Sequence, residues 1–175
     1  KFRIRQSELN KALTYVSKAV TSRSTMPVLK GILFETDGAG SLRLTASDLE
    51  LTIQKTIEVY DSEPGSIIVP AKLFSDTVRA LSGKELTIAV EANNNVKINT
   101  DSGEFKIIGM NAEEFPEIAV VNETKKLTFE RETFREMIRK VAFAASNEES
   151  KGVLVGVLIE VNEGNMTMAA LDGFR

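Results

Sequence analysis

Hydrophobic and polar positions in this 175-residue chain recur with two periods, which predict strands and helices in a fixed order. Residues 2–5 alternate apolar and polar side chains, as in a half-buried strand. Ser7 is then the expected N-cap of an amphipathic helix. Its apolar stripe comprises Leu9, Ala12, Leu13, Val16 and Val20. A second helix is predicted between Pro70, in its first turn, and Gly83, its C-terminal cap. The stripe of that helix comprises Leu73, Phe74, Thr77, Val78 and Leu81.

Seven further apolar or alternating runs predict strands around these helices, and residues 21–27 predict a loop. The strands are expected at residues 28–35, 42–45, 51–59, 66–69, 86–91, 96–99 and 104–109. Residues 1–110 therefore follow the order strand, helix, three strands, twice over. This order favours an α+β fold in which two helices cover one face of antiparallel sheets.

The beginning of the chain is repeated 125 positions later, at residues 127–145. The first helical stripe falls on Phe134, Met137, Ile138, Val141 and Ala145, and residues 29–35 fall on residues 154–160. So long a period indicates a duplicated domain. With residues 115–125 as a linker, we expect one domain over residues 1–119 and a second over residues 120–175. The second copy stops after strand, helix, loop and two strands, so we expect a fragment of a longer protein with an uncovered apolar face.

The composition excludes several classes of protein and of chemistry. The sequence has 42% hydrophobic and 27% charged residues, no His and no Cys. No apolar run is long enough for a membrane helix, and no signal-peptide pattern is present, so we expect a cytoplasmic protein. Disulfides, thiolate metal sites and His-dependent nucleophiles are ruled out. Chemistry would be left to carboxylates, Lys, Tyr or carboxylate-bound Mg²⁺.

Charge is distributed unevenly between the predicted helices and the rest of the chain. The net charge of the whole sequence is −3. The basic helix residues are Lys11, Lys18, Lys72, Arg79, Arg135, Arg139 and Lys140, and the acidic ones are Glu8, Asp76, Glu132 and Glu136. These residues give the helices +3 and leave −6 elsewhere. Basic helix faces on an acidic body suit nucleic acid contacted through its phosphates without regard to sequence. On charge alone, solvated helix surfaces explain the same pattern.

Carboxylates at equivalent places in the repeat offer a catalytic alternative. The pairs are Glu35 with Glu160, and Asp48 with Asp172. A duplication copies structural residues as readily as functional ones, and Asp-Gly is a common turn dipeptide. We therefore expect no catalytic residues, no metal and no cofactor. A strongly raised carboxylate pKa in a cleft would argue for catalysis.

Several segments, taken together with the repeat, resemble the bacterial DNA polymerase III beta subunit, the sliding clamp family. They are KFRIRQSELNKALTYVSKAV at the start, SRSTMPVLKGILFE at 22–35, PGSIIVPAKLFSDTVRAL at 64–81, EEFPEI at 113–118, FAASNEES at 143–150 and LDGFR at 171–175. The resemblance covers the whole chain. It implies the DNA-clamp fold and a non-catalytic processivity factor of the replicative polymerase. In such proteins two chains, each with three similar domains, close head to tail around duplex DNA.

The resemblance also implies two kinds of site. Arg23 matches a basic loop residue that touches DNA, and Lys72 begins a helix that lines the hole. Part of a pocket for short peptides from polymerases, the clamp loader and repair proteins is matched by Leu154, Leu171, Gly173, Phe174 and Arg175. Family members usually have Thr and His at the positions of Leu171 and Phe174, so the preferred peptide is expected to differ. Many also have Arg-Pro where this chain has Lys151-Gly152. A protein-interaction scaffold that never encircles DNA is the alternative to a clamp.

Overall fold

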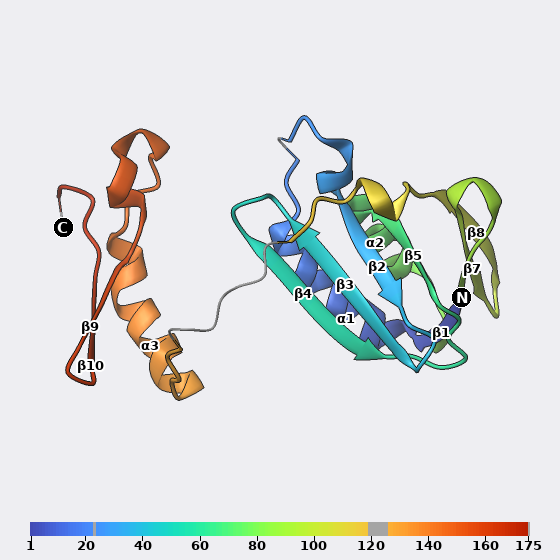
Figure 1. The fold of residues 1–175 in the computed structure, drawn as a ribbon, viewed down its shortest axis with the longest axis horizontal. Coiled ribbons are helices and arrows are strands. Elements are labelled where there is room, and N and C mark those ends of the chain that lie inside the picture. Colours follow the sequence, from blue (N-terminus) through green and yellow to red (C-terminus); the bar gives the residue numbers. More distant parts are fainter. Residues whose placement is uncertain (23, 119–125, 175) are drawn as a thin grey trace. The chain divides into compact units, whose positions relative to one another are not determined.

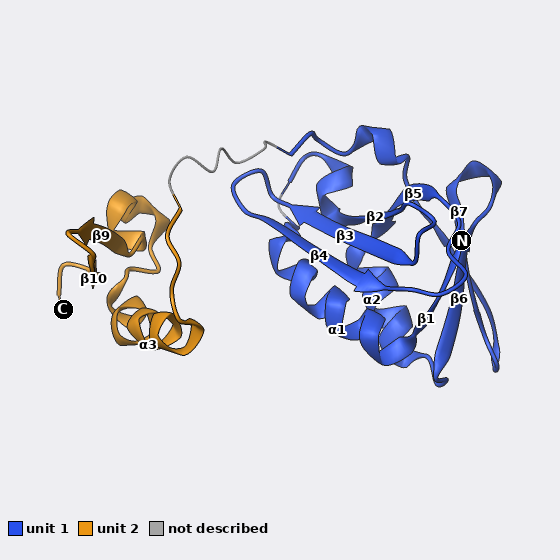
Figure 2. Cartoon of the chain, turned by 60° about the horizontal axis from the view of Figure 1, so that its bottom comes forward, with its two compact units in different colours: residues 1–119 blue, residues 120–175 orange. Residues whose placement is uncertain are grey.

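The computed structural model describes residues 1–22, 24–118 and 126–174, and the chain divides into two compact units. Unit 1 is Lys1–Ala119 and unit 2 is Val120–Arg175, shown in separate colours in Figure 2. Each unit is described by itself.

Unit 1 contains the predicted strand–helix–three-strand order twice. The first half consists of β1 (Phe2–Arg5), α1 (Gln6–Val16), η1 (Ser17–Ala19), η2 (Pro27–Lys30), β2 (Gly31–Thr36), β3 (Ser41–Ser47) and β4 (Thr52–Glu58). The second half consists of β5 (Gly65–Pro70), α2 (Ala71–Ala80), β6 (Glu85–Val90), η3 (Ala92–Asn94), β7 (Asn95–Thr100), β8 (Gly103–Ile108) and η4 (Ala112–Glu114). The α+β prediction is confirmed.

The two halves exchange their first strands. The sheets have the orders β1-β6-β7-β8 and β4-β3-β2-β5, and all neighbours are antiparallel. β1 from the first half thus pairs with β6, with Ile4 opposite Leu86. β5 from the second half pairs with β2, with Leu33 opposite Ile68. Because each half lends a strand to the other, neither half can complete its sheet alone.

The main core of unit 1 lies between the helices and the sheets. α1 packs against β3 and β4, α2 packs against β2 and β5, and the two helices contact each other (Figure 1). The helix residues in this core are Leu9, Ala12, Leu13, Val16, Ala71, Phe74 and Val78. Phe74 meets Phe34 of β2 edge to face at 5.2 Å between ring centres. Both helices therefore bury one face and leave the other to solvent.

A second, smaller cluster lies on the opposite face of the sheet that contains β2 and β5. Neighbouring strand residues point to opposite faces, so Ile32 and Phe34 join the main core while Leu33 joins this cluster. The cluster comprises Val28, Leu29, Leu33, Ile68 and Phe115. Phe115, expected at the start of a linker, is only 9% exposed. The prediction of a linker from residue 115 was wrong at its beginning, because Phe115 packs on the sheet.

Several predicted boundaries were also wrong. α1 begins at Gln6, directly after β1, so Ser7 lies within the helix and is not its N-cap. Residues 28–30 form a 3-10 turn instead of the start of a strand, and that turn begins at Pro27. Pro70 ends β5, and α2 ends at Ala80 with Leu81 as its C-cap, so Gly83 caps nothing. Leu73 was predicted in the apolar stripe but is 55% exposed, because α2 turns Ala71, Phe74 and Val78 to the core and Leu73 lies on another side of the helix.

Unit 2 repeats the beginning of unit 1 at the expected spacing. It contains α3 (Arg131–Val141), η5 (Ala142–Ala144), η6 (Glu149–Val155), β9 (Leu158–Asn162) and β10 (Asn165–Ala169). The bounds of α3 and η5 each follow those of α1 and η1 by 125 positions. β9 and β10 form an antiparallel hairpin in which Leu158 lies opposite Ala169.

The strand predicted before α3 is absent, because residues 127–130 are not in a sheet. In unit 1 the equivalent strand, β1, pairs with β6 from the second half. The described part of unit 2 holds no strand equivalent to β6. The expectation of an uncovered apolar face is consistent with the exposure of Ile138, Ile159 and Val161, each 41–49% exposed.

Candidate nucleic-acid interface and peptide pocket

The basic side chains of unit 1 stand on surfaces that point away from the core. Lys11 lies on the exposed face of α1, and Lys72 and Arg79 lie on that of α2. Lys18, predicted within the first helix, lies in η1, just after it. Its Nζ is 5.8 Å from the centre of the Tyr15 ring, a cation–π distance.

Carboxylates on the same helix accompany some of these cations. The Nζ of Lys11 is 3.2 Å from a carboxylate oxygen of Glu8, and an NH1 of Arg79 is 3.1 Å from one of Asp76. Both ion pairs are exposed, and exposed ion pairs contribute only about 0–1 kcal/mol to stability. A phosphate can therefore replace the carboxylate as the partner of either cation. Lys72 makes no ion pair with any described residue. Lys72 is therefore the readiest phosphate contact on α2.

The basic residues of α3 in unit 2 likewise include some with an ion-pair partner and one without. Arg135 lies 3.2 Å from Glu132, and Lys140 lies 3.8 Å from Glu136. Arg139 has no ion-pair partner among the described residues. All three basic side chains are exposed. Of the predicted basic residues of α3, Arg135 and Lys140 thus have a carboxylate partner among the described residues, whereas Arg139 has none.

The observed helix bounds change where the excess positive charge lies. α1 contains one acidic and one basic residue and is neutral, α2 carries +1 and α3 carries +2. Arg131, absent from the sequence-based set, lies in α3, while Lys18 lies outside α1. The helices keep a net charge of +3, but α2 and α3 supply it. Arg23, the predicted loop contact, lies outside the described residues.

The predicted peptide pocket coincides in part with an apolar cavity of about 360 Å³ in unit 2. Its walls are Val153, Leu154, Gly156, Val157, Leu158, Ala169, Ala170 and Leu171. Two predicted residues, Leu154 and Leu171, belong to it. Gly173 and Phe174 do not line it, and Arg175 lies outside the described residues. Sequence reasoning missed the other six wall residues, although the repeat relates them to buried positions of unit 1.

Phe174 follows the cavity residue Leu171 in the chain and lies on a turn held by polar contacts. Its side chain is 90% exposed, and the Nζ of Lys151 lies 5.2 Å from the centre of its ring. Lys151 also donates a hydrogen bond to the backbone carbonyl of Asp172, at 3.2 Å. The Asp172 carboxylate accepts a 2.8 Å hydrogen bond from the backbone N–H of Phe174. Gly173, with φ +93°, occupies the left-handed conformation that this turn requires.

The carboxylates considered for catalysis have structural partners. The Nε of Arg43 donates a 3.0 Å hydrogen bond to Glu35, which raises the pKa of Arg43. Asp48 accepts hydrogen bonds from the backbone N–H groups of Leu51, at 2.7 Å, and Glu50, at 3.0 Å. These bonds lower the pKa of Asp48, whereas a poised general acid needs a raised pKa.

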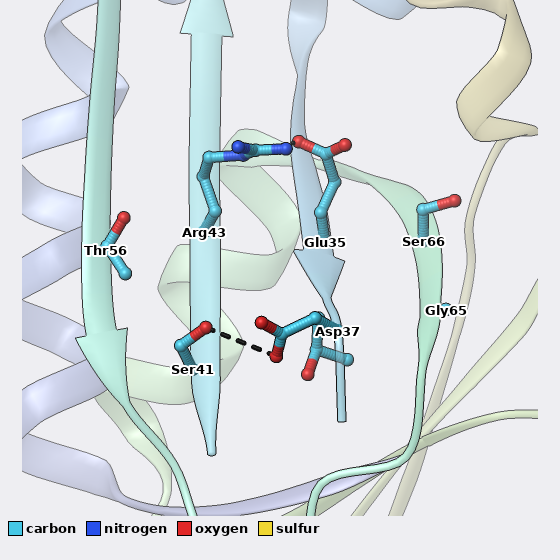
Figure 3. A pocket seen from close by; sticks show the side chains of 8 residues that line it. Glu35, Asp37, Ser41, Arg43, Thr56, Gly65 and Ser66 are labelled. Atoms are coloured by element: carbon cyan, nitrogen blue, oxygen red, sulfur yellow. Dashed lines mark hydrogen bonds and ion pairs between the residues drawn. The ribbon is translucent and has the colours of Figure 1, made fainter. Parts of the chain in front are cut away.

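A polar surface pocket of about 420 Å³ surrounds the Arg43–Glu35 pair (Figure 3). Within it, Ser41 donates to the Asp37 carboxylate at 3.4 Å. Each charged group drawn there thus has a neighbour that satisfies it. Over residues 1–22, 24–118 and 126–174, no group of acidic, His or Cys side chains is suited to a metal ion. In the same ranges no helix is long and apolar enough to cross a membrane.

Comparison with known proteins accounts for both units. The family model described as "DNA polymerase III beta subunit, N-terminal domain" matches residues 1–119, and the "central domain" model matches residues 128–175. A beta sliding clamp from Synechocystis sp. is 39% identical over 98% of this chain and 46% of its own length. A beta sliding clamp from Bacillus subtilis is 31% identical over 100% of this chain and 48% of its own length.

Solved structures agree with this assignment. A putative DNA polymerase III beta subunit from Eubacterium rectale has a TM-score of 0.90 and 31% identity, covering 98% of this chain and 46% of that one. The beta subunit from Thermotoga maritima has a TM-score of 0.86 and 31% identity, covering 99% and 47%. This chain spans about half the length of the relatives that it matches. From these family matches, over both of its units, the chain belongs to the DNA polymerase III beta subunit family.

Proposed function

We propose that this chain acts as part of a sliding clamp, the processivity factor of a replicative DNA polymerase. The observation that carries the proposal is the pair of helices in unit 1, which bury one face on the sheets and expose basic residues on the other. A clamp must hold DNA without fixing its position. Exposed, weakly paired cations suit that task, because they contact phosphates of any sequence.

Residues 1–119 form the first clamp domain in this proposal, and residues 120–175 are the first half of the second. Two full-length chains would join head to tail in a ring, with the helices lining a hole occupied by duplex DNA. The excess positive charge on α2 and α3 and the −6 charge of the remaining sequence support this arrangement. Positive charge near the duplex favours association, while an acidic exterior keeps a second duplex away.

Short peptides are the proposed partners of the cavity in unit 2. The replicative polymerase, the clamp loader and repair proteins would each present a linear motif with a hydrophobic end. An apolar cavity of about 360 Å³ is large enough for one or two hydrophobic side chains. The chain itself would supply no catalysis. Glu35 is held in an ion pair with Arg43, and Asp48 and Asp172 accept backbone hydrogen bonds within turns.

An interaction scaffold that does not encircle DNA would use the same cavity. The two functions differ in how the protein stays on DNA, because a ring is retained by topology and a scaffold by affinity. A chimera tests this difference. Residues 1–175 would replace the matching half of the Synechocystis sp. clamp, and a clamp loader would place the chimera on nicked circular DNA.

We expect the chimera to remain on the circle and to leave once the circle is cut to a linear form. The unmodified Synechocystis sp. clamp is the control for loading. Equal retention on circular and linear DNA would contradict the clamp and favour the scaffold.

A further inference from the structure

The cavity of unit 2 is lined by two chain segments that are paired as strands at one end. Its walls come from residues 153–158 and residues 169–171. The β9–β10 ladder ends at the pair Leu158–Ala169 in the described part of unit 2. Beyond that pair the two segments carry the remaining wall residues without strand hydrogen bonds between them. Side-chain contacts are therefore needed to fix the separation of the segments there.

Lys151 joins the two segments just beyond their wall residues. Val153, the first wall residue, follows Lys151 after a single glycine. Asp172 directly follows Leu171, the last wall residue. The Nζ of Lys151 donates a 3.2 Å hydrogen bond to the Asp172 carbonyl and lies 5.2 Å from the centre of the Phe174 ring. One ammonium group on the first segment therefore holds both the backbone and a side chain of the second.

Gly152 gives the backbone the path from which Lys151 reaches that carbonyl. Its φ of +56° and ψ of −120° are a conformation that residues with a Cβ rarely adopt. No atom of the described residues lies within 4 Å of the place where a Cβ would sit, so the glycine is needed for its backbone angles and not for space. Pro27 holds the matching place in unit 1, and a proline has φ fixed near about −65°. The Lys-Gly pair is therefore specific to unit 2.

Unit 1 has the matching turn at residues 48–50, held by hydrogen bonds to the Asp48 carboxylate. It lacks the tie, because Met26 and Glu50 stand at the places of the lysine and the phenylalanine. The surface of unit 1 that matches the cavity is covered by a buried apolar cluster instead. The tie is thus found in the unit whose apolar surface is open.

We propose that Lys151 is a positioning residue of the peptide cavity, which ties its two wall segments together so that the cavity is formed before a peptide arrives. The inference rests on the proposed function and adds a residue to it. A preformed cavity loses less free energy to ordering when it binds, so the same apolar contacts give a higher affinity. Lys151 acts through the walls and need not touch the peptide.

Amide hydrogen exchange without peptide tests the tie itself. In the 175-residue chain, Lys151→Met keeps an unbranched side chain but removes its charge and its hydrogen bond. We expect the Phe174 amide to exchange about threefold faster in this variant, because the turn opens more often. Lys151→Arg, which can donate to the same carbonyl and cover the same ring, should restore slow exchange. Glu148→Gln, which removes only an exposed ion pair of Lys151 at 3.8 Å, should leave the exchange unchanged. Unchanged exchange in Lys151→Met would overturn the tie.

Gly152→Ala removes the tie by a second route. It should speed exchange of the Phe174 amide by a similar factor, because alanine disfavours the backbone angles that direct Lys151. Combining it with Lys151→Met should add little to either change alone, since both remove one contact. Two effects that multiply would contradict a shared tie.

Peptide affinity tests the consequence for binding. The probe is a labelled peptide with Leu and Phe at one end and no charged side chain, followed by fluorescence anisotropy. Lys151→Met should weaken its binding about threefold, and Lys151→Arg by less than about twofold. Lys126→Met, which removes an exposed lysine of unit 2 outside the cavity, should leave binding unchanged.

A second peptide with one added Glu separates positioning from direct contact. The tie predicts the same loss in Lys151→Met for both peptides, whereas a loss confined to the acidic peptide would overturn the positioning role. If the unaltered chain and Lys151→Met bind the neutral peptide equally, the positioning role fails while the proposed function stands. If neither protein binds a peptide, the proposed function of the cavity fails, and the positioning role fails with it.

Discussion

Phe115 and Leu29, 9% and 1% exposed respectively, lie in one buried cluster on the face of the β2/β5 sheet opposite the main core of unit 1. The internal repeat relates Leu29 to Leu154, which lines the apolar cavity of unit 2. Val28 and Leu33, also buried in the cluster, correspond to Val153 and Leu158, which are 91% and 64% exposed. The same surface is therefore covered in unit 1 and open in unit 2.

Removing the Phe115 ring should destabilise unit 1. Phe115→Ala leaves a cavity over Leu29, Leu33 and Ile68, and a buried Phe→Ala change typically costs about 3–5 kcal/mol. We expect a loss near the lower value, because the ring keeps 9% exposure and belongs to a small cluster. Urea unfolding followed by the NMR signals of unit 1 measures it. Val153→Ala, at the matching exposed site, should change the free energy of unfolding by less than about 0.5 kcal/mol. Equal effects of the two changes would contradict the packing described.

Glu130 should make the stability of α3 depend on pH. Its carboxylate accepts hydrogen bonds from the backbone N–H groups of Glu132, at 3.0 Å, and Thr133, at 2.6 Å, and these bonds lower its pKa from the ordinary 4.5. A lowered pKa in the folded state stabilises the helix above pH 4.5, and this contribution is lost as pH falls through the lowered value. Amide hydrogen exchange in α3 should therefore quicken on acidification. Glu130→Gln should remove most of this pH dependence, whereas Glu136→Gln, later in the same helix, should keep it.

Peptide binding to unit 2 should depend on the walls of its cavity more than on Phe174. Leu158→Lys places a charge in the apolar cavity and should abolish binding of a short peptide with Leu and Phe at one end. Phe174→Ala should reduce affinity by less than about tenfold, since the ring does not line the cavity. Fluorescence anisotropy of a labelled peptide measures both. A larger loss for Phe174→Ala than for Leu158→Lys would show that the ring closes over the peptide.

Paired and unpaired arginines on α3 should differ in their effect on DNA. Arg139 has no ion pair among the described residues, whereas Arg135 lies 3.2 Å from Glu132. Arg139→Gln should weaken duplex binding about threefold, and Arg135→Gln by less, because Glu132, which also pairs with Arg131 at 2.6 Å, offsets part of the charge of Arg135. Binding at low salt, measured by anisotropy with a labelled duplex, compares them. Equal losses would mean that the ion pair opens fully on DNA.

Sequence patterns predicted the parts of the fold that depend on nearby residues. The apolar stripes of α1 and α3 located both helices, and their observed bounds keep the separation of 125 positions. The patterns did not predict burial or strand pairing that depends on residues far away in the sequence. Phe115 has no periodic neighbours, so only the sheet beneath it reveals that it is buried. Residues 127–130 alternate like β1 yet form no strand, because a strand needs a partner for its backbone hydrogen bonds.

The candidate sites also contain some features that the sequence predicts and others that depend on the folded structure. Sequence alone identified the basic helix residues, since exposed positions follow from the apolar stripe. It could not tell that Lys72 is free while Arg79 is paired, because that depends on side-chain geometry.

The salt dependence of duplex binding by the 175-residue chain tests the central claim most directly. The logarithm of the affinity should fall linearly with the logarithm of the salt concentration, equally for two duplexes of unrelated sequence. Lys72→Gln should reduce the steepness of that line by about one, as expected for one lost phosphate contact. An affinity that ignores salt, or that differs strongly between the two sequences, would contradict a clamp surface that contacts DNA through its phosphates.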